Sequence, residues 1–361
     1  MNYTILQGDN RQTLKTIPDN SIDAIVTDPP YGIDFLGKDW DANTGALETY
    51  QECLRVLKPG GHILAFSAAR TYHHLAITLE QAGFEIRDQI MWIYSSGFPK
   101  SMDVGRQIQK SLGVKEKTTI KGGARPSDKQ TGGRAKDKVE SKQEYTKVVC
   151  SDPEAKAWEG WGTNLKPAHE PIALARKPIK LTIAQNCQTH GVGALNIDAT
   201  RIPYDDAKSM PGSNNVGNGG NTFGNYNPEK TDKDSDGDNG QGWDPNTQGR
   251  FPSNVVGEIQ DYQKYFYCPK VGRKERHVDG QAENNHPTVK PIELMKYLIK
   301  LITPPGGTVL DPFNGSGSTG CAAVELGHTY IGCELDEKYV DIAHKRIQAW
   351  NSDNTYTDLF E

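Results

Sequence analysis

The fold of the chain is constrained most by Ala24–Thr27, an apolar and β-branched run that stops at Asp28-Pro29-Pro30-Tyr31. Such a run predicts a buried strand of a parallel sheet. The two prolines lack the N–H that a strand ladder needs, so we expect the strand to end before them. A carboxylate, a main-chain carbonyl and an aromatic ring are then held at the carboxyl end of a strand, where open α/β sheets bind ligands. A strand followed by a Pro-rich turn is the simpler alternative.

Strand and helix patterns alternate over the first 95 residues. Strands are predicted at residues 3–7, 22–27, 62–67 and 84–94, and helices at residues 10–15, 47–57 and 71–82. The helix over residues 47–57 is expected to stop at Lys58-Pro59-Gly60-Gly61, ahead of the next strand. This βα rhythm predicts a doubly wound, mostly parallel, Rossmann-like sheet.

The same rhythm returns near the end of the chain. Helices are predicted at residues 292–302, 318–326 and 336–350, and strands at residues 308–311 and 329–334. The loop over residues 312–320 is rich in glycine, and a helix that starts after such a loop favours an anion through its free N–H groups. Glu334 follows Asp311 by 23 positions, near the spacing at which an acid meets ribose hydroxyls. A Gly-rich loop alone is weak evidence for a nucleotide site.

Residues 96–280 lack this rhythm and are predicted to be an inserted recognition region with mobile loops. Within it, residues 115–147 carry ten Lys or Arg against five acids, which is typical of a basic loop that either binds phosphates or only stays solvated. Residues 168–172 are expected to be structured. Residues 232–237 imitate the start of a calcium loop, but Trp243 occupies the place of the bidentate Glu, which favours a solvated loop.

Composition excludes several classes of protein. No apolar run approaches twenty residues, and the N-terminus lacks the pattern of a signal peptide, so we expect a cytoplasmic protein with no membrane span. The six cysteines form no Cys-x-x-Cys pair, so neither a zinc site nor a disulfide framework is indicated. The net charge is −5, and any surface for DNA must therefore arise from an uneven distribution of charge.

The tetrad from Asp28 to Tyr31 resembles the catalytic motif of DNA amino-methyltransferases. Residues 311–320 resemble the S-adenosylmethionine motif of that family, and residues 286–291 resemble the segment before it. The catalytic motif comes first in this chain, an order that resembles the circularly permuted β group of these enzymes. Joining the end of the chain to its beginning restores an ordinary doubly wound sheet. In that sheet the strands ending at Asp311 and Asp28 are expected to be neighbours.

The resemblance divides the chain into four parts. Residues 1–95 are the catalytic half of the methyltransferase domain and residues 96–280 the inserted target-recognition region. Residues 281–350 are the cofactor-binding half, and residues 351–361 are a loose tail. More weakly, residues 193–198 and 250–254 look like methylases of phage or prophage type.

The resemblance also implies the site and its ligands. It assigns the catalytic role to Asp28, Pro29, Pro30 and Tyr31, and no metal. The cofactor is S-adenosylmethionine, and the residues expected to bind it are Asp9, Thr288, Lys290, Asp311, Phe313, Gly315, Gly317 and Glu334. Simpler roles stay open for some of them: Glu334 as a solvated strand end, Lys290 as a turn cap and Phe313 as packing under the loop. Double-stranded DNA is the expected partner, and a homodimer and a cognate restriction enzyme are compatible with the family.

The expected reaction is methylation of the N6 amino group of adenine in duplex DNA, with N4 of cytosine as the alternative. Adenine is favoured because the acid at position 28 resembles adenine enzymes, whereas most N4-cytosine enzymes carry Ser there. Methylation of a protein or RNA is a weaker alternative, since such enzymes usually place the cofactor motif first. A non-catalytic DNA-binding module that kept the fold is disfavoured by the intact Asp28 and Tyr31.

Overall fold

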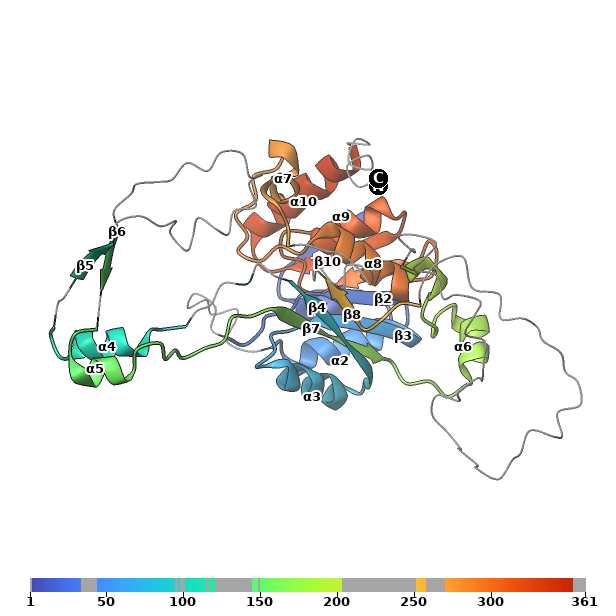
Figure 1. Cartoon of the computed structure of the whole chain (residues 1–361). Coiled ribbons are helices and arrows are strands. Elements are labelled where there is room, and N and C mark those ends of the chain that lie inside the picture. Colours follow the sequence, from blue (N-terminus) through green and yellow to red (C-terminus); the bar gives the residue numbers. More distant parts are fainter. Residues whose placement is uncertain are drawn as a thin grey trace, which may run out of the picture. The chain divides into compact units, whose positions relative to one another are not determined.

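The computed structural model describes residues 2–33, 44–94, 97, 101–114, 117–120, 145–148, 150–202, 251–257 and 270–352. The chain forms two compact units, one from Met1–Ile93 together with Glu170–Glu361, and one from Tyr94–His169. Figure 1 shows the elements of each unit. The calcium-like residues 232–237, most of the predicted basic loop and most of the tail lie outside the described residues.

The first unit is built on an eight-stranded sheet in the order β1-β10-β9-β2-β3-β7-β4-β8. The bounds are β1 Tyr3–Gln7, β2 Ile22–Thr27, β3 Leu57–Phe66, β4 Glu85–Ile93, β7 His169–Arg176, β8 Val255–Gly257, β9 Thr308–Asp311 and β10 Thr329–Glu334. Neighbours from β1 through β3 are parallel, β7 is antiparallel to β3, and β8 is parallel to β4. The predicted mostly parallel α/β sheet is confirmed, and so is the prediction that β9 and β2 are neighbours.

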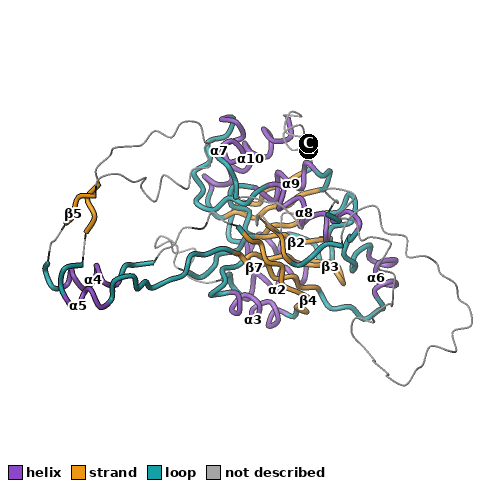
Figure 2. The backbone as a smooth tube through the Cα atoms, in the orientation of Figure 1, coloured by secondary structure: helices purple, strands orange, loops and turns teal. Residues whose placement is uncertain are grey.

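Helices cover both faces of this sheet. Figures 1 and 2 show α2 and α3 on one side and α8, α9 and α10 on the other. The helices of this unit are α1 Asn10–Thr13, α2 Leu47–Val56, α3 Tyr72–Ala82, α6 Ile183–His190, α7 Arg273–His277, α8 Ile292–Ile302, α9 Ser318–Glu325 and α10 Glu337–Ser352. All six residues of β2 are buried, as expected for a strand between two helical layers.

One predicted boundary is wrong. The strand after α2 was expected to begin at residue 62, but β3 begins at Leu57 and includes residues 58–61. A Cβ on Gly61 would lie 3.0 Å from the carbonyl oxygen of Asp23, so glycine allows the two strands to approach closely. The pairing of β2 with β3 shifts register between Ile22 and Ala24, which accommodates the extra residues as a bulge.

The structure also differs from the predicted insertion over residues 96–280, because β7 and β8 belong to the main sheet. The antiparallel strand β7 lies outside the alternation of strands and helices, so that alternation does not predict it. The smaller unit, Tyr94–His169, contains α4 Val104–Ser111, α5 Pro153–Ala157 and the antiparallel strands β5 Lys117–Ile120 and β6 Tyr145–Val148. Among the described residues, no helix is long and apolar enough to cross a membrane.

Candidate active site

The carboxyl ends of β2 and β9 are tied together by the side chain of Asp311. Thr27, at the end of β2, donates its hydroxyl to Asp311 Oδ1 at 2.7 Å, and Thr319 in α9 donates to Oδ2 at 2.6 Å. Burial raises the pKa of Asp311 to about 6, although both hydroxyl donors act to lower it. Asp311 is expected to bind the cofactor, but the residue is 2% exposed and its oxygens accept hydrogen bonds from two buried hydroxyls. Its observed role is therefore to hold the two motifs together.

The predicted catalytic tetrad lies directly after β2, and Asp28 is held there by an ion pair. Lys290 Nζ lies 2.5 Å from Asp28 Oδ2 and donates to the Tyr31 hydroxyl oxygen at 3.0 Å. The Tyr31 hydroxyl in turn donates to Glu170 Oε2 at 2.9 Å. Glu170 also faces Lys290 Nζ at 3.4 Å and Lys270 Nζ at 3.5 Å. The structure thus brings Asp28 and Tyr31 together with a second carboxylate and two ammonium groups.

Burial and charge act against each other in this cluster. Burial raises the pKa of Asp28, and the neighbouring Lys290 opposes that rise. Burial acts to raise the pKa of Glu170 as well, but Lys290 and Lys270 together bring it below its usual value. Burial acts to lower the pKa of Lys290, but Asp28 and Glu170 raise it above its usual value. Glu170 and Lys290 are therefore charged at neutral pH.

One oxygen of the catalytic-motif acid has no hydrogen-bond donor among the described residues. This oxygen, Asp28 Oδ1, is buried. A buried carboxylate oxygen left without a donor is unfavourable, so such an atom points to a donor that arrives with a substrate. Pro29 is buried and Pro30 is partly buried, which keeps the turn that carries this oxygen rigid.

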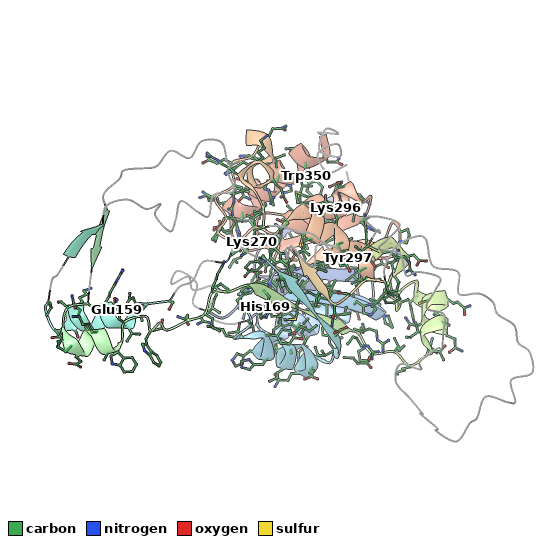
Figure 3. All side chains as sticks on the ribbon, in the orientation of Figure 1. Glu159, His169, Lys270, Lys296, Tyr297 and Trp350 are labelled. Carbon is green, nitrogen blue, oxygen red and sulfur yellow. The ribbon has the colours of Figure 1, made fainter. Side chains whose placement is uncertain are left out.

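Aromatic rings surround the ammonium groups of the cluster. Lys290 Nζ lies 4.8 Å from the ring centroid of Phe66 and 5.3 Å from that of Tyr31. Trp92 packs edge-on against Phe66, with ring centroids 6.4 Å apart, and Lys270 Nζ lies 5.8 Å from the Trp92 ring. Lys270 is labelled in Figure 3. Each of these ammonium groups is attracted to the electron-rich face of a neighbouring ring, which helps to hold it in the cluster.

The predicted glycine loop and the predicted ribose acid meet at the ends of β9 and β10. Gly315 N donates to Glu334 Oε2 at 2.7 Å, and Asp336 N donates to Oε1 at 2.9 Å. Gly315 and Gly317 have φ of +52° and +79°, a region that disfavours residues with a Cβ. Burial raises the pKa of Glu334 to about 7, against the lowering effect of the two amide donors.

Asp9 lies just after β1, the strand next to β10, and its side chain has a structural role. Its Oδ1 accepts the backbone N–H of Arg11 at 2.9 Å, which caps α1, and its carboxylate pairs with the Arg11 guanidinium. Gly8 N donates to the carbonyl oxygen of Glu334 at 2.8 Å, so Asp9 is placed beside the glycine loop. The geometry supports its capping role directly.

Phe313 and Thr288 are the remaining residues that the sequence assigns to cofactor binding. The partly buried Phe313 ring lies 6.3 Å from the Tyr50 ring, and the Phe313 N–H donates to Asp311. The backbone N–H and carbonyl of Thr288 both contact His286 Nδ1, at 3.3 and 2.6 Å. Burial lowers the pKa of His286 to about 4, so its imidazole is neutral.

Sequence reasoning missed Glu170, Lys270 and Phe66, and it expected Lys290 on the cofactor side. In the structure the Lys290 ammonium contacts the catalytic motif instead. The weak signal for Glu170 was an acid ahead of Pro171 and an apolar run, in a segment predicted to be structured. Its role depends on β7 lying next to β3, which no local pattern indicates.

Comparison with known proteins gives a family match. A family model described as DNA methylase, for N6 and N4 methyltransferases, matches residues 22–345. The matched span includes the Asp28 tetrad, the glycine loop and the whole segment between them.

Individual relatives are distant. The chain is 24% identical over 393 aligned residues to the type II methyltransferase M.HindIII of Haemophilus influenzae, covering 95% of this chain and 94% of that protein. It is 24% identical to the DNA adenine methyltransferase YhdJ of Escherichia coli K12, covering 95% of this chain and 82% of that protein. Among solved structures, a complex of M1.HpyAVI with SAM is 18% identical, has a TM-score of 0.45, and covers 96% of this chain and 98% of that one.

Proposed function

Since the chain belongs to the N6/N4 DNA methylase family, we propose that it transfers a methyl group from S-adenosylmethionine to the N6 amino group of adenine in duplex DNA. The observation that carries the proposal is Asp28 Oδ1, a buried acceptor without a partner among the described residues. It lies in a tetrad at the end of β2, beside the strand that leads into the glycine loop. An exocyclic amine would provide the missing donor.

The residues beside the glycine loop fit S-adenosylmethionine. The partly buried carboxylate of Glu334 suits two ribose hydroxyls, because a carboxylate accepts several hydrogen bonds. Phe313 offers an aromatic face, and Gly315 and Gly317 allow a close approach of backbone to ligand. The bound cofactor supplies an electrophilic methyl group on a positively charged sulfur. The match to the DNA methylase family over residues 22–345 supports this assignment.

The protein's own contribution is to make a poor nucleophile reactive. The lone pair of the adenine amine is delocalised into the ring, and two acceptors on its two hydrogens would draw the nitrogen toward tetrahedral geometry. We assign these acceptors to Asp28 Oδ1 and the Pro29 carbonyl. Tyr31 would stack on the base after it leaves the duplex, as base-modifying enzymes require. Positioning and stabilisation of positive charge on the nitrogen then account for the catalysis.

The finer assignments rest on the same site. The acid at position 28 and the similarity to YhdJ, a DNA adenine methyltransferase, support adenine over N4 of cytosine. The order of the motifs supports the permuted β group, and we assign target recognition to the Tyr94–His169 unit. A homodimer and a cognate restriction enzyme belong to the same proposal.

The test is the chemical identity of the product. Unmethylated DNA is incubated with the full chain and S-adenosylmethionine, digested to nucleosides and resolved by mass spectrometry. N6-methyladenine is expected. N4-methylcytosine as the sole product would overturn the adenine assignment and leave the methyltransferase assignment standing, whereas no methylated nucleoside would overturn both.

A further inference from the structure

The catalytic tetrad with Lys290 provides no net negative charge beside the target amine. Asp28 is paired with Lys290, so these two side chains together carry no net charge. In methyl transfer to an amine, positive charge moves onto the nitrogen, and a neutral pair next to it gives little stabilisation. A site for this reaction needs a net negative charge on the side of the target.

Glu170 supplies that charge. Its carboxylate comes from β7, the antiparallel strand beside β3, and it contacts both the Tyr31 hydroxyl and Lys290. With Glu170 included, the buried Lys290 and the two partly buried acids Asp28 and Glu170 sum to one negative charge. Lys270 also pairs with Glu170 at 3.5 Å, but its side chain is 40% exposed, so water partly screens its charge and it offsets less of the negative charge than the buried Lys290 does.

The contacts also give Glu170 a geometric role. Tyr31 donates to Glu170 while Lys290 donates to Tyr31, so the ring that is assigned to stack on the base is held from two sides. Lys290 divides its contacts between Asp28 Oδ2 and Glu170 Oε2. This arrangement leaves Asp28 Oδ1 available for the target amine.

We propose that Glu170 is a positioning residue of the methyl-transfer site, which offsets the charge of Lys290 and orients Tyr31. The inference rests on the proposed methyltransferase function and extends it to a residue outside both motifs. It assigns to Lys290 the matching task of holding Asp28 Oδ2. Asp28 remains the group that contacts the substrate.

The experiment uses single-turnover methyl transfer from tritiated S-adenosylmethionine to unmethylated genomic DNA. Glu170→Gln keeps the size of the side chain and removes its charge, and it should slow transfer by about 10–100-fold. Glu170→Asp should retain more activity, because it keeps the charge. Lys290→Met leaves two facing carboxylates and should also slow transfer.

The decisive variant combines Glu170→Gln with Lys290→Met, because it restores a single negative charge. It should be faster than either single variant, by about tenfold over Glu170→Gln, which is a coupling that independent sites would not show. A double variant as slow as the product of the two single effects would overturn the proposal. A wild-type chain that transfers no methyl group to DNA would instead overturn the proposed function on which it rests.

Two further measurements separate this role from a general effect on folding. Affinity for S-adenosylmethionine should change less than about threefold in the Glu170 variants, because the glycine loop is untouched. Glu325→Gln is the matched control: Glu325 pairs with Lys296 at 2.6 Å and with Trp350, away from the tetrad, and Figure 3 labels Lys296 and Trp350. Its transfer rate should equal that of the wild type.

The pH profile gives the second signature. The titratable groups that face Asp28 are Lys290, Tyr31, Glu170 and, from β9, Asp311. Removing the negative Glu170 lowers the pKa of Asp28, so the acid limb of the rate profile should move to lower pH in Glu170→Gln. Removing Lys290 should move it to higher pH. An acid limb at the same pH as in the wild type in both variants would contradict the proposed effect of Glu170 and Lys290 on the charge of the site.

Discussion

At the scale of single residues, the site separates groups that hold structure from groups that remain available to a ligand. Asp311 is buried and both of its oxygens accept hydroxyl donors, whereas Asp28 has one oxygen without a donor among the described residues. Both are acids at the ends of neighbouring parallel strands. Their different surroundings, not their residue type, place Asp311 in the framework and make Asp28 the proposed acceptor of the target amine.

Asp28→Ala should abolish methyl transfer, because the amine loses its charged acceptor, and it should leave cofactor affinity within about threefold. Calorimetric titration with S-adenosylmethionine and the tritium transfer assay measure the two effects separately. Normal methyl transfer, or a loss of cofactor affinity large enough to account for the lost transfer, would remove Asp28 from the target side.

The proposed ribose contact of Glu334 predicts that cofactor binding depends on pH. The pKa of Glu334 is raised to about 7, so the carboxylate proposed to accept ribose hydroxyls is largely protonated at pH 6 and largely ionised at pH 8. Affinity for S-adenosylmethionine should therefore rise as pH increases from 6 to 8. Glu334→Gln should bind about 5–150-fold more weakly at pH 8, the cost of about 1–3 kcal/mol for a lost buried acceptor, and should lose this part of the pH dependence. Equal pH slopes for the two proteins in calorimetry would contradict the assignment.

The same ionisation affects folding. The folded pKa of Glu334 lies above the unfolded value of 4.5, so the folded state binds more protons than the unfolded state between about pH 4.5 and 7. Its contribution therefore favours the folded state below pH 4.5 and is lost as pH rises through 7. Glu334→Gln should flatten the fall in the free energy of unfolding across that window, measured by urea titration.

At the scale of elements, α9 has a left-handed glycine at each end, and the two ends differ in their surroundings. Gly317 precedes α9 with φ of +79°, and Gly327 follows it with φ of +77°. A Cβ at Gly317 would lie 3.0 Å from the Cβ of Ala343 in α10, whereas a Cβ at Gly327 would have no atom within 4 Å. Substitutions at Gly327 and Gly317 therefore distinguish the cost of backbone strain alone from the cost of strain together with steric crowding.

Gly327→Ala should cost about 1–2 kcal/mol in the free energy of unfolding, from the left-handed backbone alone. Gly317→Ala should cost more than this, since α10 must also move, and it should weaken cofactor binding because the loop before α9 shifts. Urea unfolding and calorimetry measure both changes. Equal costs for the two variants would show that α10 yields without strain.

The elements also explain what the sequence could and could not reveal. The strand before Asp28 and the loop after Asp311 are local patterns, so both were predictable from residue order and spacing. The hydrogen bond between Thr27 and Asp311 joins positions 284 residues apart. The sequence predicted that β2 and β9 are neighbours, and this placed the two residues close together. Glu170 and the contact of Lys290 with Asp28 were not predictable, because they depend on where β7 enters the sheet.

At the scale of the whole molecule, the smaller unit offers a direct test of where DNA is bound. Ile120 and Tyr145 are paired across β5 and β6, so an Asn-Gly turn can replace residues 121–144 without extending either strand. Those residues contain seven Lys or Arg and four acids.

Excision of residues 121–144 should lower DNA affinity and reduce the slope of affinity against salt concentration, if the basic residues contact phosphates. A full-length variant with the seven basic residues changed to Gln is the matched control for chain length. Fluorescence anisotropy over a range of salt concentrations measures both proteins. A salt slope equal to that of the parent in both variants would show that the segment is only solvated.

The ends of the smaller unit are joined by a backbone hydrogen bond from Tyr94 N to the carbonyl oxygen of Ala168, at 2.9 Å. Everything between these two residues leaves and returns through one break in the larger unit. Genetic recombination at those two points would replace the whole segment in one event, while every strand of the eight-stranded sheet and both motifs would be inherited unaltered. If target recognition lies in this segment, as we propose, a lineage with this architecture can acquire a new recognition sequence without having to evolve its chemistry again.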